Sequence, residues 1–239
     1  MARVRTMRCL GPADQPICSV FLAAESALLT ADPWDRHDAG LSLHTGFAEA
    51  MAMPKVLIVT GDGAEDLEVM YPYQRLLEEG YEVDVAGPSS KKLQFVVHDF
   101  VDGFDTYTEK AGHTWPADVA FADVDPTGYV ALVLPGGRAP EYIRNDEDCL
   151  RIVKHFFDAD KPVAALCHGP LVLAAAGVIN GRGVSAYPAC APDVRAGGAE
   201  FIDSAAQVDG VLVTGRAWPD HPAWMREFMK VLRAKAPTS

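Results

Sequence analysis

A cysteine followed by a histidine stands where an apolar run meets a Gly-Pro pair, in the segment Ala164-Ala165-Leu166-Cys167-His168-Gly169-Pro170. Proline suits the first position of a helix, because the N–H that it lacks would have no partner there. The segment therefore predicts a strand that ends at Cys167 and a helix that begins just after it. Unpaired N–H groups at the start of a helix favour a thiolate and lower its pKa. We expect Cys167 to be a nucleophile at a sharp strand-to-helix turn rather than a small buried hydrophobe.

The other four cysteines have no comparable surroundings. Cys149 stands at the start of a predicted helix, Cys190 lies in a proline-rich turn, and we favour a packing role for both. Cys9 and Cys18 belong to the N-terminal segment. The five cysteines are odd in number, widely spaced and never arranged as CxxC, so we expect neither a disulfide framework nor a metal site. A reducing, cytoplasmic setting is the corresponding expectation.

A pair of glycines ends another apolar run, in the segment Leu134-Pro135-Gly136-Gly137-Arg138-Ala139-Pro140-Glu141. Glycines let the backbone approach a ligand closely, and their N–H groups can form part of an oxyanion hole. A dinucleotide site is not expected, because no G-x-G-x-x-G follows a strand anywhere in the chain.

Three carboxylates open the first predicted helix, at Glu65, Asp66 and Glu68. Negative charges at a helix start complement its dipole, and we expect this role for two of them. If one instead points inward beside Cys167, burial would raise its pKa and fit it for moving a proton. The sequence leaves open which of the three that is.

Apolar runs and amphipathic stretches alternate along the rest of the chain. Continuous apolar runs predict strands that are buried on both faces, and the segments between them predict helices, which together favour an α/β sandwich of parallel strands between helical layers. In such sheets chemistry gathers at the carboxyl ends of the strands. The predicted strands are 56–59, 81–87, 129–134, 163–166 and 211–214, and the predicted helices are 66–79, 147–158, 170–176 and 221–234.

The N-terminal segment and the overall charge limit the domain organisation and the classes of partner that we expect. Residues 1–52 show no sustained period, and we interpret them as an extension, with residues 53–239 as one α/β domain. A formal charge of −12 offers no basic stripe, so a nucleic-acid partner is not expected. No stretch approaches the roughly 18 apolar residues of a membrane helix, so we expect no membrane partner either.

Three blocks of sequence together resemble the PfpI (DJ-1) superfamily, over about Lys55 to the C-terminus. They are Gly63-Ala64-Glu65-Asp66-Leu67-Glu68 with Tyr71-Pro72-Tyr73, the double-glycine segment, and Ala165-Leu166-Cys167-His168-Gly169-Pro170. The resemblance implies a flavodoxin-like fold, related to class I glutamine amidotransferases. It implies that Cys167 is the nucleophile, that Glu68 is a buried acid bonded to its sulfur, and that Gly136, Gly137 and His168 surround the oxyanion.

The resemblance also carries expectations about neighbouring groups. The residue that matches Glu141 reaches the His168 imidazole from a second subunit in the intracellular-protease-like branch, which implies a catalytic dimer or a hexamer. The segment from Val97 to His113 looks most like a longer branch that includes plant tandem-domain glyoxalases. His98 and His113 would then line the pocket, with a solvated or packing role as the alternative.

Three functions remain open on these residues. The first is a cofactor-independent, glutathione-independent glyoxalase that acts on methylglyoxal or glyoxal, or a related deglycase acting on glycated protein or peptide. The second is a cysteine peptidase built from Cys167, His168 and Glu141, ranked lower because a histidine next in sequence reaches the sulfur only if the turn rotates it suitably. The third is a redox-sensing stress protein or chaperone in which Cys167 is oxidised. A glutamine amidotransferase is disfavoured, because no His-x-Glu pair follows Cys167.

Overall fold

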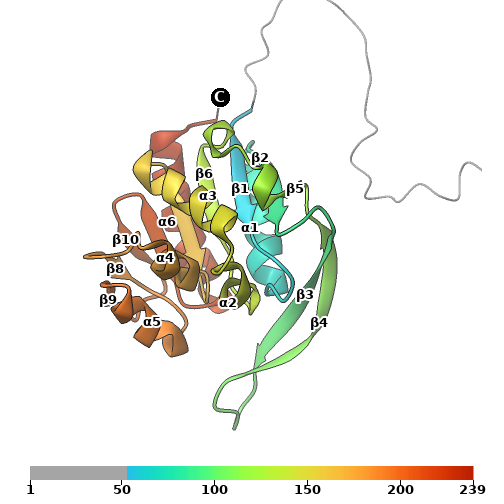
Figure 1. Cartoon of the computed structure of the whole chain (residues 1–239). Coiled ribbons are helices and arrows are strands. Elements are labelled where there is room, and N and C mark those ends of the chain that lie inside the picture. The colour runs from blue at the N-terminus through green and yellow to red at the C-terminus, as the bar shows by residue number, and fades with distance from the viewer. Residues whose placement is uncertain (1–52, 239) are drawn as a thin grey trace, which may run out of the picture. The chain divides into compact units, whose positions relative to one another are not determined.

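A computed structural model describes residues 53–238 of the protein (Figure 1). The predicted N-terminal extension, with Cys9 and Cys18, lies outside the described residues. The strands are β1 (Lys55–Val59), β2 (Glu82–Gly87), β3 (Lys92–Phe100), β4 (Tyr107–Pro116), β5 (Val119–Ala120), β6 (Ala131–Leu134), β7 (Val163–Leu166), β8 (Gly183–Val184), β9 (Glu200–Phe201), β10 (Gln207–Asp209) and β11 (Leu212–Gly215). The α-helices are α1 (Asp66–Glu78), α2 (Ala139–Ile143), α3 (Glu147–Asp158), α4 (Pro170–Ala176), α5 (Ala191–Ala196) and α6 (His221–Lys235).

Seven strands form one sheet, in the order β10-β11-β7-β6-β1-β2-β5. All neighbours are parallel except β10, which runs antiparallel to β11 at one edge. Successive side chains of a strand point to opposite faces, so an apolar run without alternation must be covered on both. Strand β1 shows this arrangement: Leu57 and Val59 join one hydrophobic cluster, whereas Val56 and Ile58 join the other.

Helices cover both faces of this sheet. Val69 of α1 and Phe228 of α6 belong to the cluster that contains Ile58. Phe156 of α3 and Val172 of α4 belong to the cluster that contains Leu57. This mainly parallel sheet between helical layers confirms the predicted α/β sandwich, and each predicted strand and helix is present with ends shifted by at most two residues.

The β3–β4 hairpin is the largest element that the apolar-run analysis does not predict. It forms a separate two-stranded antiparallel sheet and extends away from the main sheet in Figure 1. Its root is anchored by the buried Leu93, which pairs with Trp115, whereas Phe104 at its tip is exposed. Most residues of β4 are solvent-accessible, so the hairpin carries no continuous apolar run that would mark it in the sequence.

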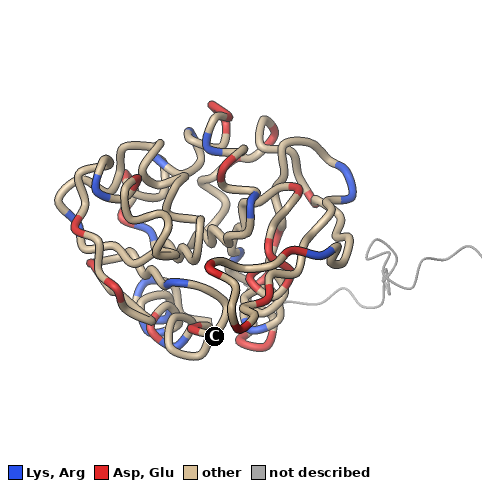
Figure 2. The backbone as a smooth tube through the Cα atoms, turned by 90° about the horizontal axis from the view of Figure 1, so that it is seen from below, with Lys and Arg blue, Asp and Glu red and all other residues tan. Residues whose placement is uncertain are grey.

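Charged residues are scattered over the molecule. Lys and Arg lie among Asp and Glu rather than on one side, as the view in Figure 2 shows. None of the helices in residues 53–238 is long and apolar enough to cross a bilayer.

Candidate active site at the carboxyl ends of the strands

Cys167 lies at the turn between β7 and α4, with its backbone in the left-handed region at a φ of 59°. This conformation is strained for a residue other than glycine, and it persists only where the surroundings impose it. Here the Cys167 N–H donates to the Gly215 carbonyl at 3.2 Å, and the Cys167 carbonyl accepts from the Tyr187 N–H at 3.0 Å. Gly169 caps α4 and Pro170 takes its first position. The predicted sharp strand-to-helix turn at Cys167 is confirmed.

Glu68 is the carboxylate that points inward. Its side chain is fully buried and forms a hydrogen bond with the Cys167 thiol. One carboxyl oxygen accepts from the Gly136 N–H at 2.8 Å, and the other accepts from the Trp218 N–H at 3.1 Å. Burial, reinforced by the charge of Glu65, raises the pKa of Glu68 to about 8. A group with this pKa can hold or accept a proton near neutral pH.

The other two carboxylates of this turn serve the helix and the hairpin. Glu65 caps α1 by accepting from the Glu68 N–H at 2.9 Å, and burial raises its pKa to about 7. Asp66 accepts from the His113 ring at 2.6 Å. Glu68 is therefore the inward-pointing member of the cluster. Of the two carboxylates expected to serve the helix start, Glu65 caps it and Asp66 binds the hairpin.

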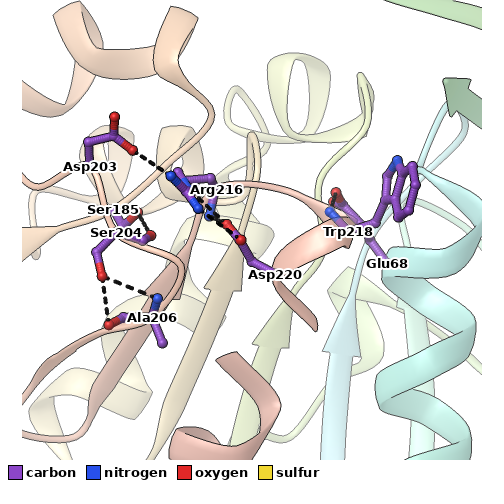
Figure 3. A network of polar contacts seen from close by, with 8 residues as sticks. All are labelled: Glu68, Ser185, Asp203, Ser204, Ala206, Arg216, Trp218 and Asp220. Atoms are coloured by element: carbon purple, nitrogen blue, oxygen red, sulfur yellow. Dashed lines mark hydrogen bonds and ion pairs between the residues drawn. The ribbon is translucent and has the colours of Figure 1, made fainter. Parts of the chain in front are cut away.

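A turn stabilised by salt bridges carries the Trp218 N–H that donates to the Glu68 carboxylate. Trp218 belongs to the 3₁₀ turn Trp218–Asp220, which lies between β11 and α6. Arg216 binds both carboxyl oxygens of Asp220, at 2.8 and 3.0 Å, and reaches Asp203 at 2.9 Å (Figure 3). A two-point contact of this kind fixes geometry better than a single hydrogen bond does. Arg216 therefore positions the Trp218 N–H against the Glu68 carboxylate.

The thiol pKa differs from the sequence-based expectation. Burial, followed by the negative charge of Glu68, raises the pKa of Cys167 well above its ordinary value, although the Gly137 N–H opposes this by donating to the sulfur. The prediction that a helix start lowers this pKa is wrong for the free protein, because desolvation of a buried thiolate outweighs the oriented amides. Cys167 and Glu68 thus hold their protons as one interacting pair.

The double-glycine turn packs directly against this pair. A Cβ at Gly136 would lie 2.4 Å from the Cys167 Cβ and 2.6 Å from a Glu68 carboxyl oxygen, so no side chain fits there. Gly137 has a φ of 74°, and a Cβ on it would lie 2.3 Å from the Glu65 nitrogen. Both glycines are therefore required by close backbone approach, and they bring amide N–H groups beside the sulfur.

His168 lies beside Cys167, and Glu141 lies beside His168. The His168 Nδ1 is 3.3 Å from the Cys167 sulfur, and its Nε2 is 3.8 Å from a Glu141 oxygen. Burial lowers the pKa of His168 to about 4, so the imidazole is neutral at physiological pH. The resemblance implies that Glu141 comes from a second subunit. Within one chain α2 already brings Glu141 near the imidazole, and the contribution of a second subunit stays a prediction.

The two histidines of the hairpin, His98 and His113, lie in different surroundings. His98 is buried. Its Nε2 donates to the Glu109 carboxylate at 3.0 Å, and its ring stacks on that of Tyr107 with the centroids 4.0 Å apart. Tyr107 in turn contacts His168 edge-on, with the ring centroids 6.0 Å apart, so His98 is connected to the site through Tyr107. His113 is exposed and pairs with Asp66, and within the described residues no contact joins it to Cys167. The structure brings His98 near the site and does not bring His113 there.

An aromatic wall beside Cys167 was not predicted from the sequence. It consists of Phe100 and Tyr107 from the hairpin together with Tyr187 and Trp218 from the loops that follow β8 and β11, linked by ring contacts of 5.4 to 6.4 Å. Tyr187 also stacks on His168 at 5.4 Å. Their positions in the sequence span more than a hundred residues, and the only sequence signal was the resemblance of the hairpin segment to a glyoxalase branch.

The other two described cysteines, Cys149 and Cys190, are also buried, and Cys190 lies within electrostatic range of Cys167 and Glu68. Burial raises the pKa of Cys149 and of Cys190 to about 12 each. Over residues 53–238 no group of three or more histidine, cysteine, aspartate or glutamate side chains could hold a metal ion.

The sequence profile of the DJ-1/PfpI family matches residues 54–231. Deglycase TK1284 of Thermococcus kodakarensis is 46% identical over 179 residues, covering 75% of this chain and 99% of that protein. Protein DJ-1 homolog D of Arabidopsis thaliana is 39% identical over 231 residues. That match covers 91% of this chain and 58% of the plant protein, so this chain spans little more than half of that relative's length.

A solved structure shows the same fold. The ThiJ/PfpI domain protein of Brachyspira murdochii superposes with a TM-score of 0.66 at 22% sequence identity, covering 76% of this chain and 96% of that one. The profile match includes the turn at Cys167, the inward-pointing Glu68 and the double-glycine segment. The chain belongs to the DJ-1/PfpI family.

Proposed function

We propose that the protein is a cofactor-independent glyoxalase, or a closely related deglycase, that uses Cys167 as its nucleophile. The observation that carries this proposal is the fully buried Glu68, whose carboxyl group is hydrogen-bonded to the Cys167 thiol and whose raised pKa of about 8 suits proton transfer near neutral pH. Relatives at 41–46% identity that are named deglycases support it.

The first step is addition of the thiol to an aldehyde. The Cys167 sulfur forms a bond to the aldehyde carbon, and the thiol proton passes to the former carbonyl oxygen, which gives a hemithioacetal. His168, neutral and 3.3 Å from the sulfur, can carry that proton. The Gly137 N–H donates to the sulfur, and the His168 backbone nitrogen lies beside Gly136 in the same turn, so both groups can serve as donors to a developing oxyanion.

The second step moves a proton between adjacent carbons. The ionised Glu68 takes the proton from the carbon that is bonded to sulfur, and the neighbouring carbonyl oxygen gains a proton, which gives an enediol. Glu68 then returns its proton to the neighbouring carbon while the hydroxyl of the former hemithioacetal loses its proton, which gives a thioester of the 2-hydroxy acid. A raised pKa makes this carboxylate a better base near neutral pH. Water then cleaves the thioester, so one aldehyde and one water yield one 2-hydroxy acid and the free thiol.

Lactate release from methylglyoxal tests this proposal. The wild-type chain should release lactate, and Cys167→Ser should release none. Cys149→Ala is the matched control, because that cysteine is also buried but belongs to α3, and it should keep wild-type turnover. Retained turnover in Cys167→Ser would reject the chemistry.

Deglycase activity is tested separately with a peptide carrying a methylglyoxal adduct. Direct action requires that lactate appear faster than the adduct releases aldehyde by itself. Lactate formation no faster than spontaneous release would restrict the protein to the free aldehyde.

A peptidase is the second candidate, and one observation favours it. Cys167, His168 and Glu141 form a Cys-His-carboxylate series within one chain, at 3.3 and 3.8 Å. The Glu141 side chain is half-exposed, and the second distance exceeds hydrogen-bond range, so this series is looser than the contact with Glu68. A fluorogenic peptide assay tests this activity, and the mass measured by light scattering tests the dimer or hexamer that the family resemblance implies.

A further inference from the structure

Tyr107 occupies a distinct place in the aromatic wall. Its ring meets His168 edge-on at 6.0 Å and Tyr187 at 5.4 Å. The phenol is also within electrostatic range of the Cys167 thiol and of Glu141. Tyr107 is the first residue of β4, directly opposite Phe100 on β3, so the hairpin brings it to the candidate active site from outside the main sheet.

The hydroxyl of Tyr107 is available to a ligand. No hydrogen bond to it is found over residues 53–238, whereas the hydroxyl of Tyr187, the other tyrosine beside His168, already pairs with Thr106 at 3.2 Å. Burial, with the nearby Cys167 and Glu141, raises the pKa of Tyr107 above its ordinary value. The phenol is therefore a proton-bearing hydrogen-bond donor throughout the physiological range.

The Tyr107 ring is held in place from behind. His98 stacks on it at 4.0 Å with the ring planes 21° apart. Glu109 bonds to His98 at 3.0 Å and to two nitrogens of Arg138 at 2.6 and 2.8 Å, and Arg138 adjoins the double-glycine turn. This chain of contacts links the hairpin to the loop that lies beside Cys167, so the donor is pre-positioned before any substrate arrives.

We propose that Tyr107 is a substrate-binding residue that donates a hydrogen bond to the oxygen on the carbon next to the one attacked by Cys167. This assignment rests on the proposed glyoxalase chemistry. It names the feature of the substrate that the wall recognises: a second oxygen on the adjacent carbon, as in a 1,2-dicarbonyl. A simple aldehyde lacks that oxygen and gains nothing from the Tyr107 hydroxyl.

Tyr107→Phe in the full-length chain tests the assignment, because it removes the hydroxyl and keeps the ring stack. The kcat/KM for lactate release from methylglyoxal should fall about tenfold or more, as loss of one hydrogen bond to substrate predicts. A second readout does not need turnover. Reversible capture of an aldehyde by Cys167 protects the thiol from iodoacetamide, and the concentration that gives half-protection is measured for methylglyoxal and for propanal.

The protection assay separates substrate recognition from a structural effect. In Tyr107→Phe, the half-protecting concentration should rise about tenfold for methylglyoxal and stay within about twofold for propanal. The rate of iodoacetamide labelling without aldehyde should also stay within about twofold. Tyr142→Phe is the matched control, because it removes an exposed hydroxyl from α2, and it should match the wild type in every measurement.

Each outcome decides a different point. Unchanged turnover and unchanged methylglyoxal protection in Tyr107→Phe overturn the assignment and leave the proposed function standing. Equal weakening for both aldehydes also overturns it, because the residue would then act through the fold. A wild type that releases no lactate, yet is protected by methylglyoxal in a Tyr107-dependent way, rejects the glyoxalase and supports the assignment. Absence of protection by either aldehyde in the wild type overturns both.

Discussion

Two regions meet at Cys167, and they are built in opposite ways. The inner region consists of backbone turns at the carboxyl ends of β1, β6 and β7, where Glu68, Gly136 and Cys167 pack within contact distance and exclude solvent. The outer region is the β3–β4 hairpin, whose β4 strand is largely exposed. The backbone of β3 bonds to the turn before α1, from the Val96 N–H to the Ala64 carbonyl, whereas Tyr107, His98 and Glu109 reach the site through their side chains.

This difference suggests a division of roles in which the inner region carries out the chemical step and the hairpin recognises the substrate. A buried region with no spare volume fixes the distances on which proton transfer depends and raises the pKa values of its acids. The exposed outer part of the hairpin, unlike its buried root, can vary in length and composition without disturbing the core, because protruding elements tolerate change. Substitutions in the inner region should therefore abolish turnover, whereas substitutions in the hairpin should alter the preference for substrate.

The largest effect is expected for Gly136→Ala. Its Cβ would overlap the Cys167 Cβ and the Glu68 carboxylate, and both neighbours are held by backbone hydrogen bonds. Lactate release should disappear, and overpacking should lower the free energy of unfolding by about 1–3 kcal/mol, as measured in urea. Gly128→Ala is the control, because nothing lies within 4 Å of a Cβ at Gly128. Normal turnover in Gly136→Ala would contradict the close packing of the inner region.

Glu68→Gln comes next. It keeps the side-chain shape, removes the proton-transfer group and should lower kcat by about 10²–10⁴-fold. Glu78→Gln, on the exposed face of the same helix, should leave kcat unchanged. Retention of more than about a tenth of wild-type kcat in Glu68→Gln would exclude Glu68 as the base.

Stability should also respond to pH through Glu68. Its pKa is raised from 4.5 to about 8, so between these values the folded protein binds a proton that the unfolded chain has released. Stability is then fully present below about pH 4.5 and declines as the pH rises towards 8, by up to about 1.4 kcal/mol per pH unit. Glu65, with a pKa of about 7, contributes in the same direction. In Glu68→Gln this decline should become shallower, and an unchanged slope in urea titrations would contradict the raised pKa.

The same contrast explains how much the sequence could predict. The turn at Cys167, the double-glycine segment and the strands before them follow from local rules, since apolar runs, glycines and prolines act on their immediate neighbours. The choice of Glu68 among three carboxylates depends on the direction in which α1 packs, and the net shift of the thiol pKa depends on burial. Neither of these is a local property.

The aromatic wall is harder still to predict from the sequence. Tyr107 and Tyr187 come together only because the hairpin contacts the loop that follows β8. No periodicity relates two residues that are eighty positions apart. The resemblance of the hairpin segment suggested that His98 and His113 line the pocket, whereas His98 stacks behind Tyr107 and His113 binds Asp66.

Glu109→Gln should have an intermediate effect, and mainly on substrate preference. Arg138 holds the pKa of Glu109 at about 2, so the carboxylate contact is present above about pH 4.5 and is lost as the pH falls towards 2. Loss of this partly exposed contact should lower stability by less than about 1 kcal/mol, because solvent screens it. It should lower kcat/KM for methylglyoxal by up to about tenfold by loosening His98 behind Tyr107.

Asp99→Asn is the control for Glu109→Gln, since the Asp99–Lys110 pair belongs to the same hairpin at 2.6 Å but is more exposed. Equal losses of activity in the two variants would show that the hairpin acts as a whole rather than through Glu109. Loss in Glu109→Gln alone would sharpen the distinction between the hairpin's site-facing contacts and its solvent-exposed ones.

The smallest effect is expected at the hairpin tip, and the comparison here is between the tip and the root of the hairpin. Phe104 is 61% exposed, so Phe104→Ser should change the free energy of unfolding by no more than about 0.5 kcal/mol and leave lactate release unchanged. Leu93 at the hairpin root is fully buried, so Leu93→Ala should lower the free energy of unfolding by about 2–5 kcal/mol. If Phe104→Ser instead destabilised the protein by more than about 1 kcal/mol and lowered its mass in light scattering, the tip would be packed against another copy of the chain. The outer region would then be a subunit contact as well as a wall of the site, because the same hairpin carries both Phe104 and Tyr107.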